Sequence, residues 1–260
     1  MKVASKSPIK NKPLRHAGQS LDEQIDTLIN EKAVSYVLSG IFVFWFAGYE
    51  WWRFYRNPEP SPKIITVFAL AWTVFCAYKI KIILNKVRNL RQGRDGERAV
   101  GQYLDELRQN GHRVFHDILA DQFNVDHVVI STKGIFAIET KTYSKPQRGE
   151  ARITFDGEKL LIKGKQPTNN PVTQVSAAAK WLQSVLLEST GKKMPIKPVV
   201  LFPGWFIETL PQARNASAWV LNPKAFPAYI TNQANVLTNE DMQLACYHLS
   251  RYIRSKEASR

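Results

Sequence analysis

Two long apolar segments near the N-terminus dominate the pattern of the chain. Residues 33–52 contain a single charged residue, and residues 64–84 contain only two lysines, close to their end. Each segment reaches about 20 residues, the length that an α-helix needs to cross the hydrocarbon core of a bilayer. The alternative is a pair of core helices in a soluble protein, but such helices show a polar face and these show almost none. The pattern predicts a two-helix transmembrane hairpin over residues 33–85.

Basic residues are concentrated on both sides of this predicted hairpin rather than in its loop. Six lysines and arginines lie in residues 1–32 and six in residues 79–94, against three in the loop at residues 53–63. The positive-inside rule places both ends of the hairpin in the cytoplasm. We therefore expect residues 1–32 to form a basic cytoplasmic tail, membrane lipid to surround residues 33–85, and the protein to lie in a bacterial inner or cell membrane.

Beyond the hairpin, helical and strand patterns alternate. We interpret the glycines of residues 92–96 as a linker, followed by an amphipathic helix that ends at Gly111. Strand patterns separated by turn signals follow, and Asn170 has the features of a helix N-cap. Two short apolar strands and a closing helix complete the order. This order predicts a mixed α/β domain over residues 93–210, with a helical extension of residues 211–260 packing on it.

The formal net charge of +14 comes from 36 lysines and arginines against 22 aspartates and glutamates. Such an excess favours association with polyanions, either nucleic acid or an anionic lipid surface. The sequence shows no Ser–His–Asp set, no phosphate-binding glycine loop and no zinc-binding cysteine pattern. These observations argue against other hydrolase types, nucleotide-driven enzymes and zinc modules.

The most informative short pattern is VDHVVISTKGIFAIETK, residues 125–141, in which two apolar runs flank the turn signal STKG. If the central two residues of STKG form the turn, Asp126 lies opposite Glu139, with Cβ atoms about 5 Å apart on one face. Lys141 lies two residues beyond Glu139 and shares that face. The pattern therefore predicts an Asp–Glu–Lys cluster on one side of a sheet.

Two opposed carboxylates repel each other, and a divalent cation between them would remove this cost. Their hard oxygen atoms suit Mg²⁺ or Mn²⁺ better than a structural zinc. Such a cation polarises a phosphoryl oxygen and activates water, while Lys141 orients or deprotonates that water or stabilises negative charge. The alternative is a cross-strand salt bridge on a half-exposed face. Apolar neighbours on the predicted face, including Val128 and Ala137, favour a functional cluster.

Taken in order, these residues resemble the nuclease-related domain (NERD), a branch of the PD-(D/E)XK restriction-endonuclease-like superfamily. The resemblance covers residues 93–205, and Val125 takes the place of the proline in the superfamily name. The matching pieces are Gly96 and Glu97 at the start of a helix, the run Val125 to Val128, the Glu139-Thr140-Lys141 motif, Gln174 in NPVTQ, and the strand PVVLFPG.

The resemblance implies a restriction-endonuclease-like fold, a mixed sheet flanked by helices, with a site that uses Mg²⁺ or Mn²⁺. It implies that Asp126 and Glu139 are metal ligands, that the Thr140 carbonyl completes the coordination, and that Lys141 is the catalytic lysine. Glu97 and Gln174 would support the site from two helices. Each of the latter two also has a simpler interpretation, because Glu97 suits a first helical turn and Gln174 suits an exposed helix surface.

These observations lead to one principal hypothesis and two alternatives. The principal hypothesis is a membrane-anchored, metal-dependent nuclease whose substrate is nucleic acid, with DNA as the expected partner. In the first alternative, the same fold tethers nucleic acid or a protein to the membrane without catalysis. The second alternative is a structural membrane component whose charged hairpin is only salt-bridged. His127 points to the opposite face of its strand and is expected to be a hydrogen-bonded core histidine.

Overall fold

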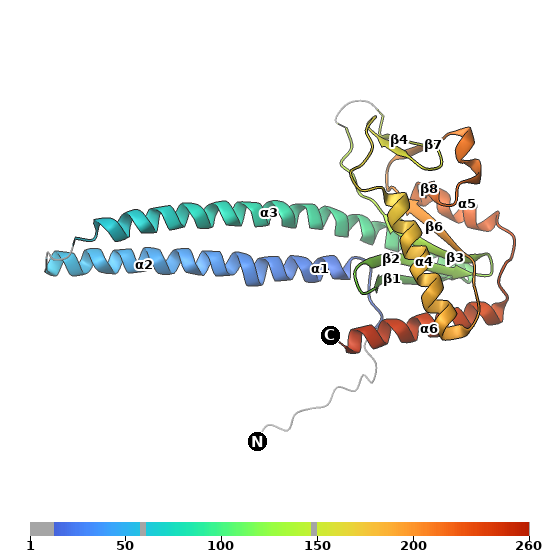
Figure 1. The fold of residues 1–260 in the computed structure, drawn as a ribbon, viewed down its shortest axis with the longest axis horizontal. Helices are drawn as coiled ribbons and strands as arrows, with labels where there is room; N and C mark the ends of the chain where they lie inside the picture. Colours follow the sequence, from blue (N-terminus) through green and yellow to red (C-terminus); the bar gives the residue numbers. More distant parts are fainter. Residues whose placement is uncertain (1–12, 58–60, 147–149, 260) are drawn as a thin grey trace, which may run out of the picture. The chain divides into compact units, whose positions relative to one another are not determined.

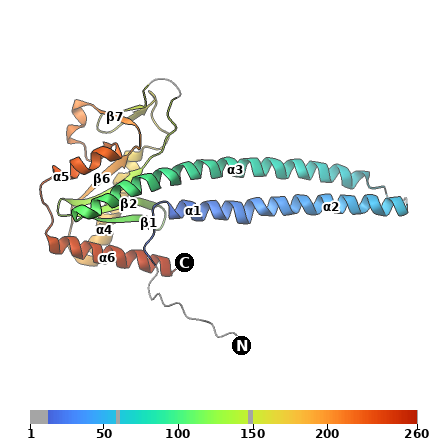
Figure 2. The same cartoon turned by 180° about the vertical axis from the view of Figure 1, so that it is seen from behind.

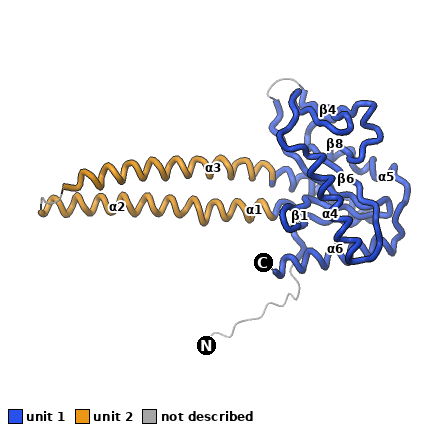
Figure 3. The backbone as a smooth tube through the Cα atoms, viewed as in Figure 1, with its two compact units in different colours: residues 1–19, 94–260 blue, residues 20–93 orange. Residues whose placement is uncertain are grey.

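A computed structural model describes residues 13–57, 61–146 and 150–259 of the chain. The chain divides into two compact units (Figure 3). One unit contains residues 20–93, and the other contains residues 1–19 together with residues 94–260. The second unit is therefore assembled from both sides of the first along the sequence.

The unit of residues 20–93 is helical (Figure 1). Helix α1, Gln19–Asp26, continues through a π-helical stretch, η1, Thr27–Ala33, into α2, Val34–Arg56; α3 spans Lys63–Glu106. Within the described residues, two helices are long and apolar enough to cross a membrane. This agrees with the predicted spans in number and position, although the first helix already begins at Gln19.

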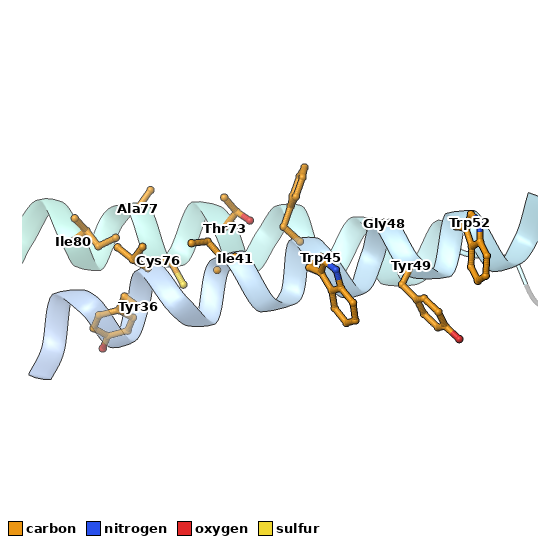
Figure 4. A pocket seen from close by; sticks show the side chains of 13 residues that line it. Tyr36, Ile41, Trp45, Gly48, Tyr49, Trp52, Thr73, Cys76, Ala77 and Ile80 are labelled. Atoms are coloured by element: carbon orange, nitrogen blue, oxygen red, sulfur yellow. The ribbon is translucent and has the colours of Figure 1, made fainter.

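Aromatic and small residues form a groove between α2 and α3, with a volume of about 860 Å³ (Figure 4). Trp45, Tyr49 and Trp52 lie along α2, and Cys76 and Ala77 come from α3. The two helices are also joined by polar contacts inside this apolar region. The indole N–H of Trp72 donates to Ser39 Oγ at 2.7 Å, and that of Trp51 donates to Thr66 Oγ1 at 2.8 Å.

The other unit has a mixed α/β fold. Among its described residues, five strands form the main sheet in the order β1-β2-β3-β6-β8. Strand β2 is antiparallel to both β1 and β3, whereas β3, β6 and β8 run parallel to one another. The strands are β1, Arg113–Leu119; β2, Asn124–Ser131; β3, Gly134–Thr140; β6, Ile196–Leu201; and β8, Trp219–Leu221. Strand β3 is therefore the central strand of the sheet.

Helices cover both faces of this sheet. Helices α4, Pro171–Thr190, and α6, Asn239–Ala258, pack on one face (Figure 1), where Val128, Ala137 and Leu249 share one core. The C-terminal part of α3 and helix α5, Phe226–Thr231, pack on the other (Figure 2), where Leu104, Phe136 and Phe226 meet. The expected mixed sheet flanked by helices is confirmed.

A second, smaller sheet of three described strands has the order β5-β4-β7. It contains β4, Arg152–Phe155; β5, Leu160–Ile162; and β7, Phe206–Thr209. Asp156 and Gly157 form the turn between β4 and β5, where Asp156 Oδ1 accepts hydrogen bonds from the backbone N–H groups of Glu158 and Lys159. The chain after residue 210 contributes β8 to the main sheet in addition to its helices.

The predicted linker at residues 92–96 was wrong, because α3 passes through this segment without interruption. Glycine disfavours a helix, but it also lets another backbone approach closely. Gly96 uses this property: a Cβ built there would lie 1.8 Å from Thr142 Oγ1 and 2.9 Å from Thr142 Cβ. The absence of a side chain at Gly96 therefore lets α3 pack closely against Thr142, in the segment that follows β3.

Replacing Gly96 by alanine should destabilise the domain by about 1–3 kcal/mol, because the new methyl group cannot be accommodated by moving a flexible side-chain end. Gly93→Ala is the matched control. A Cβ at Gly93 would meet only Leu21 Cδ1, at 3.5 Å, so this change should be neutral or stabilise the helix by up to about 1 kcal/mol. Thermal unfolding of the two variants measures the difference, and equal melting temperatures would contradict the close-packing role of Gly96.

The last turn of this helix confirms a further prediction. The 3₁₀ helix η2, Leu107–Asn110, follows α3 directly and ends at Gly111, whose φ of 83° is left-handed. Helix α4 is likewise capped at both ends: the side chain of Asn170 accepts a hydrogen bond from the N–H of Val172, and Gly191, with φ of 70°, follows the last helical residue. Both helices thus stop where glycine permits the left-handed conformation.

Candidate active site

The hairpin of β2 and β3 has the register that its sequence predicts. Ser131 pairs with Gly134, Ile130 with Ile135, and the pairing continues to His127 opposite Ile138. The next opposed positions are Asp126 and Glu139. Val128 and Ala137, on the same face by strand alternation, are buried in the core under α4 and α6. The two carboxylates therefore stand at the end of an apolar face.

Asp126 is held in place by the neighbouring strand. The backbone N–H of Thr140 donates to Asp126 Oδ2 at 2.7 Å, so a side-chain hydrogen bond takes over at the end of the regular pairing. This bond fixes the carboxylate beside the Glu139-Thr140-Lys141 motif. Its second oxygen remains available for another ligand, because an ionised carboxylate has about four acceptor positions.

Lys141 is the third member of the cluster and follows the last residue of β3. Its ammonium Nζ lies 2.5 Å from Glu139 Oε1. Its backbone N–H donates to the carbonyl of Leu201 in β6 at 3.0 Å, which anchors the residue to the central part of the sheet. The side chains of Lys141 and Glu139 are 26% and 13% exposed. They therefore lie at the boundary between core and solvent, where a substrate can reach them.

Glu97 approaches the same cluster from α3. Burial, followed by the negative charges of Asp117 and Glu139, raises the pKa of Glu97 to about 8. Burial and the charges of Glu139 and Glu97 also raise the pKa of Asp126 well above its ordinary value. Burial opposes the charged form of Lys141, but the Glu139 ion pair outweighs it and raises the pKa of Lys141. Thus, Glu97 is largely protonated at neutral pH in the absence of a cation, and the lysine is positively charged.

A fourth carboxylate, Asp117, lies near this group and was missed in the sequence analysis. It stands in β1 with φ of 50° and is almost completely buried. Arg15, also buried, donates from Nε to Asp117 Oδ2 at 2.8 Å and forms a further ion pair with Glu257. The available signal was the pairing of β1 with β2. His116 pairs with His127 and Ile118 with Val125, so Asp117 and Asp126 occupy the positions between these pairs. Arg15 gave no sequence signal, since it lies 102 residues from its partner.

Two other candidate residues have different surroundings. Gln174 is exposed on the first turn of α4, and its side chain makes no hydrogen bond within the described part of the chain. The structure therefore does not join Gln174 to the carboxylate cluster by a contact. His127 is a buried core histidine, as expected: its Nδ1 lies 2.9 Å from Nδ1 of His116, which in turn contacts Asp105.

The donor set fits a hard divalent cation in its chemistry. Among the described residues, no group of three or more histidine, cysteine, aspartate and glutamate side chains is arranged to hold a metal ion. Magnesium, however, is usually bound by one or two carboxylates and keeps several waters. Asp126 and Glu139 supply two carboxylates, and burial together with the nearby charge of Glu139 raises the pKa of Asp126. A backbone carbonyl such as that of Thr140 is a further oxygen ligand of the same kind.

The raised pKa of Glu97 predicts a dependence of stability on pH. Between its ordinary pKa of 4.5 and its folded pKa of about 8, the folded protein binds more protons at Glu97 than the unfolded chain does. The contribution of Glu97 to folding stability is therefore fully present below its unfolded pKa, and it is lost as the pH rises through its folded pKa. We expect Glu97→Gln to become progressively more stable than wild type as pH increases from about 5 to about 8, since glutamine carries no charge.

Melting temperatures of the full chain in neutral detergent with EDTA, for wild type and Glu97→Gln at each pH, measure this difference. The comparison is needed because burial lowers the pKa values of His116 and His127, which changes stability with pH in the opposite direction. That contribution is common to both proteins and cancels. A difference that stays constant from pH 5 to pH 8 would show that Glu97 has an ordinary pKa in the folded protein.

Comparison with known proteins agrees with the geometry of the site. Residues 92–203 match the model of the nuclease-related domain, NERD. The matched segment contains Asp126, Glu139, Lys141, Glu97 and Gln174, whereas Arg15 and Glu257 lie outside it. Searches of curated proteins and of solved structures find no match. With its mixed sheet, its flanking helices and this match, the chain carries a nuclease-related domain at residues 92–203.

Proposed function

We propose that this protein is a membrane-anchored, divalent-metal-dependent nuclease that hydrolyses phosphodiester bonds in nucleic acid. The observation that carries the proposal is the convergence of Asp126, Glu139 and Lys141 at the end of β3. The Asp126 carboxylate is fixed by the 2.7 Å bond from Thr140, and the Lys141 ammonium lies 2.5 Å from Glu139. Two carboxylates and a cation at a solvent boundary form a site for a metal ion and a phosphate.

Each residue of the cluster has a distinct role in this proposal. Asp126, Glu139 and the Thr140 carbonyl hold Mg²⁺ or Mn²⁺, which when bound supplies a Lewis acid and lowers the pKa of water. Lys141 acts as a cation rather than a base, because its ion pair keeps it protonated. It donates hydrogen bonds to the negative charge that develops on the phosphoryl group. Glu97, with a pKa of about 8, accepts or releases a proton near neutral pH.

The anchoring part of the proposal is supported by the exposure of the two long helices. Only 6% of the most apolar window in residues 19–56 and 17% of that in residues 63–110 is buried. Leu38, Phe42 and Trp45 are each at least 60% exposed. A core helix of a soluble protein would bury such side chains, since exposed apolar surface in water is unfavourable. A lipid environment accounts for their exposure.

The proposal is tested by incubating the full chain, in neutral detergent, with labelled single- and double-stranded DNA and RNA. Cleavage should appear with Mg²⁺ or Mn²⁺ and disappear with EDTA. It should be absent in preparations of the Glu139→Ala variant purified in the same way, which controls for contaminating nucleases. Absence of metal-dependent cleavage on every substrate would contradict the catalytic part of the proposal.

One observation favours a second candidate function, in which the domain tethers nucleic acid to the membrane without cutting it. The ion pair between Lys141 and Glu139 already neutralises one of the two carboxylates. A domain that keeps this pair closed would bind nucleic acid by its positive charge alone. Binding that is independent of Mg²⁺, with no cleavage under the same conditions, distinguishes this function from the first.

A further inference from the structure

An arginine-rich pocket lies between the edge strand β1 and helix α6, in the unit that contains the nuclease-related domain. Its volume is about 730 Å³. In the part of the chain that the structure describes, four arginines line it: Arg108, Arg113, Arg251 and Arg254. They come from three elements, since Arg108 lies in η2, Arg113 begins β1, and the other two belong to α6.

The charge of this pocket is largely uncompensated. Arg108 is paired with Asp105, at 2.6 Å between Nε and Oδ1. Arg113, Arg251 and Arg254 are exposed, and no carboxylate of the described residues forms an ion pair with them. Within residues 13–57, 61–146 and 150–259, no acidic residue lines the pocket. Like charges placed together without a partner repel each other, and an anionic ligand would remove that repulsion.

The chemistry of the pocket favours a polynucleotide over other anions. Guanidinium groups bind phosphate oxygens with paired hydrogen bonds, which makes arginine the preferred residue for phosphate recognition. The aromatic ring of Tyr247 lines the same pocket and is 63% exposed. An exposed ring beside cationic side chains is the arrangement in which proteins stack a base while neutralising the backbone. An anionic lipid headgroup would bind the arginines but offers no base on which the ring can stack.

The position of the pocket agrees with this ligand. Arg113 and Asp117 lie four residues apart on β1, which corresponds to about 13 Å along an extended strand. Asp117 is close enough to the carboxylate cluster to raise the pKa of Glu97. A nucleic-acid strand a few nucleotides long covers such a distance, so one strand can reach from the pocket to the carboxylate cluster.

We propose that the pocket between β1 and α6 binds backbone phosphates of a single nucleic-acid strand, with Tyr247 stacking on one base. This contact surface is separate from the carboxylate cluster. The inference deepens the proposed nuclease function, because it implies a substrate strand held away from the cleavage position. Binding itself does not depend on catalysis and can be measured without it.

The test measures binding of a fluorescent 20-nucleotide single strand of DNA to the full chain in discs of neutral phosphatidylcholine, with EDTA present. The test variant is Arg251→Glu with Arg254→Glu. The matched control is Lys180→Glu with Lys193→Glu, which makes the same charge change at two exposed positions outside the pocket. We expect the arginine variant to bind about tenfold more weakly or worse, and to show a salt dependence reduced by about one to two in slope. Tyr247→Ala should weaken binding with an unchanged salt slope.

Three outcomes would overturn the inference: unchanged binding in the arginine variant, an equal loss in the lysine control, or loss of binding to phosphatidylglycerol vesicles with oligonucleotide binding intact. The last result would assign the pocket to lipid. A different result would contradict the proposed nuclease function. If the wild type binds the oligonucleotide through these arginines but never cleaves it with Mg²⁺ or Mn²⁺, the inference stands and the catalytic proposal does not.

Discussion

Alanine at Glu139 or at Lys141 should reduce metal-dependent cleavage by about a thousandfold or more, equivalent to about 4 kcal/mol of transition-state stabilisation. Glu139→Ala removes one of the two carboxylates that would hold the cation. Lys141→Ala removes the ammonium that lies 2.5 Å from Glu139. The measurement is the initial rate on the best nucleic-acid substrate. Glu158→Ala and Lys159→Ala, in the exposed turn between β4 and β5, make the same changes outside the site and should cut like wild type.

The same variants should show that the loss is not caused by unfolding. Glu139 contributes to the raised pKa of Asp126, so its removal relieves repulsion in the metal-free protein. We therefore expect Glu139→Ala to melt at the same temperature as wild type, or higher, in EDTA. Such a site trades stability for function. Either active-site variant cutting at the wild-type rate would remove the basis for the proposed mechanism.

Replacing Arg15 by alanine should destabilise the domain by about 3–5 kcal/mol, because it leaves buried carboxylates without their cation. The side chains of Arg15 and Asp117 are 1% and 2% exposed, and Glu257 also pairs with the arginine. Denaturant unfolding of the full chain in neutral detergent measures the change. Arg15 lies far outside the segment that matches the nuclease-related domain, so sequence comparison alone would not anticipate this effect.

Lys256→Ala provides the control for Arg15. Lys256 also pairs with a carboxylate, that of Asp121, but the two side chains are 35% and 80% exposed. An exposed pair of this kind contributes about 0–1 kcal/mol. If Arg15→Ala and Lys256→Ala had equally small effects, the buried ion pair would not be the link that joins residues 13–19 to the domain.

Local sequence patterns predicted much of this structure, because strand register, helix ends and long apolar helices depend on residues that are close together in the sequence. Alternation of side chains sets the register that opposes Asp126 and Glu139, and a one-residue slip would have exposed the apolar face. Asn170 and Gly191 bound their helix because capping and left-handed geometry act within one turn. The two long apolar helices followed from length and composition, which do not depend on tertiary contacts.

The features that the sequence did not predict depend on contacts between residues that are distant in the sequence. The glycines of residues 92–96 signal a break locally, but packing of Gly96 against Thr142 outweighs the weak helix propensity of glycine. Asp117 became part of the cluster only through the pairing of β1 with β2, and its cation comes from residue 15. The position of Gln174 depends on how α4 rotates against the sheet, which one residue type cannot reveal.

The ion pairs of Arg15 also restrict how the chain can be threaded through a membrane. They hold the segment before the long helices in the same folded unit as Asp117 and Glu257, which come after them. A folded unit occupies one side of a bilayer, so the helices between its two parts must cross an even number of times or not at all. Two spans satisfy this parity requirement, and a single span does not. This conclusion is independent of the distribution of basic residues, and it holds for whichever side of the membrane the unit occupies.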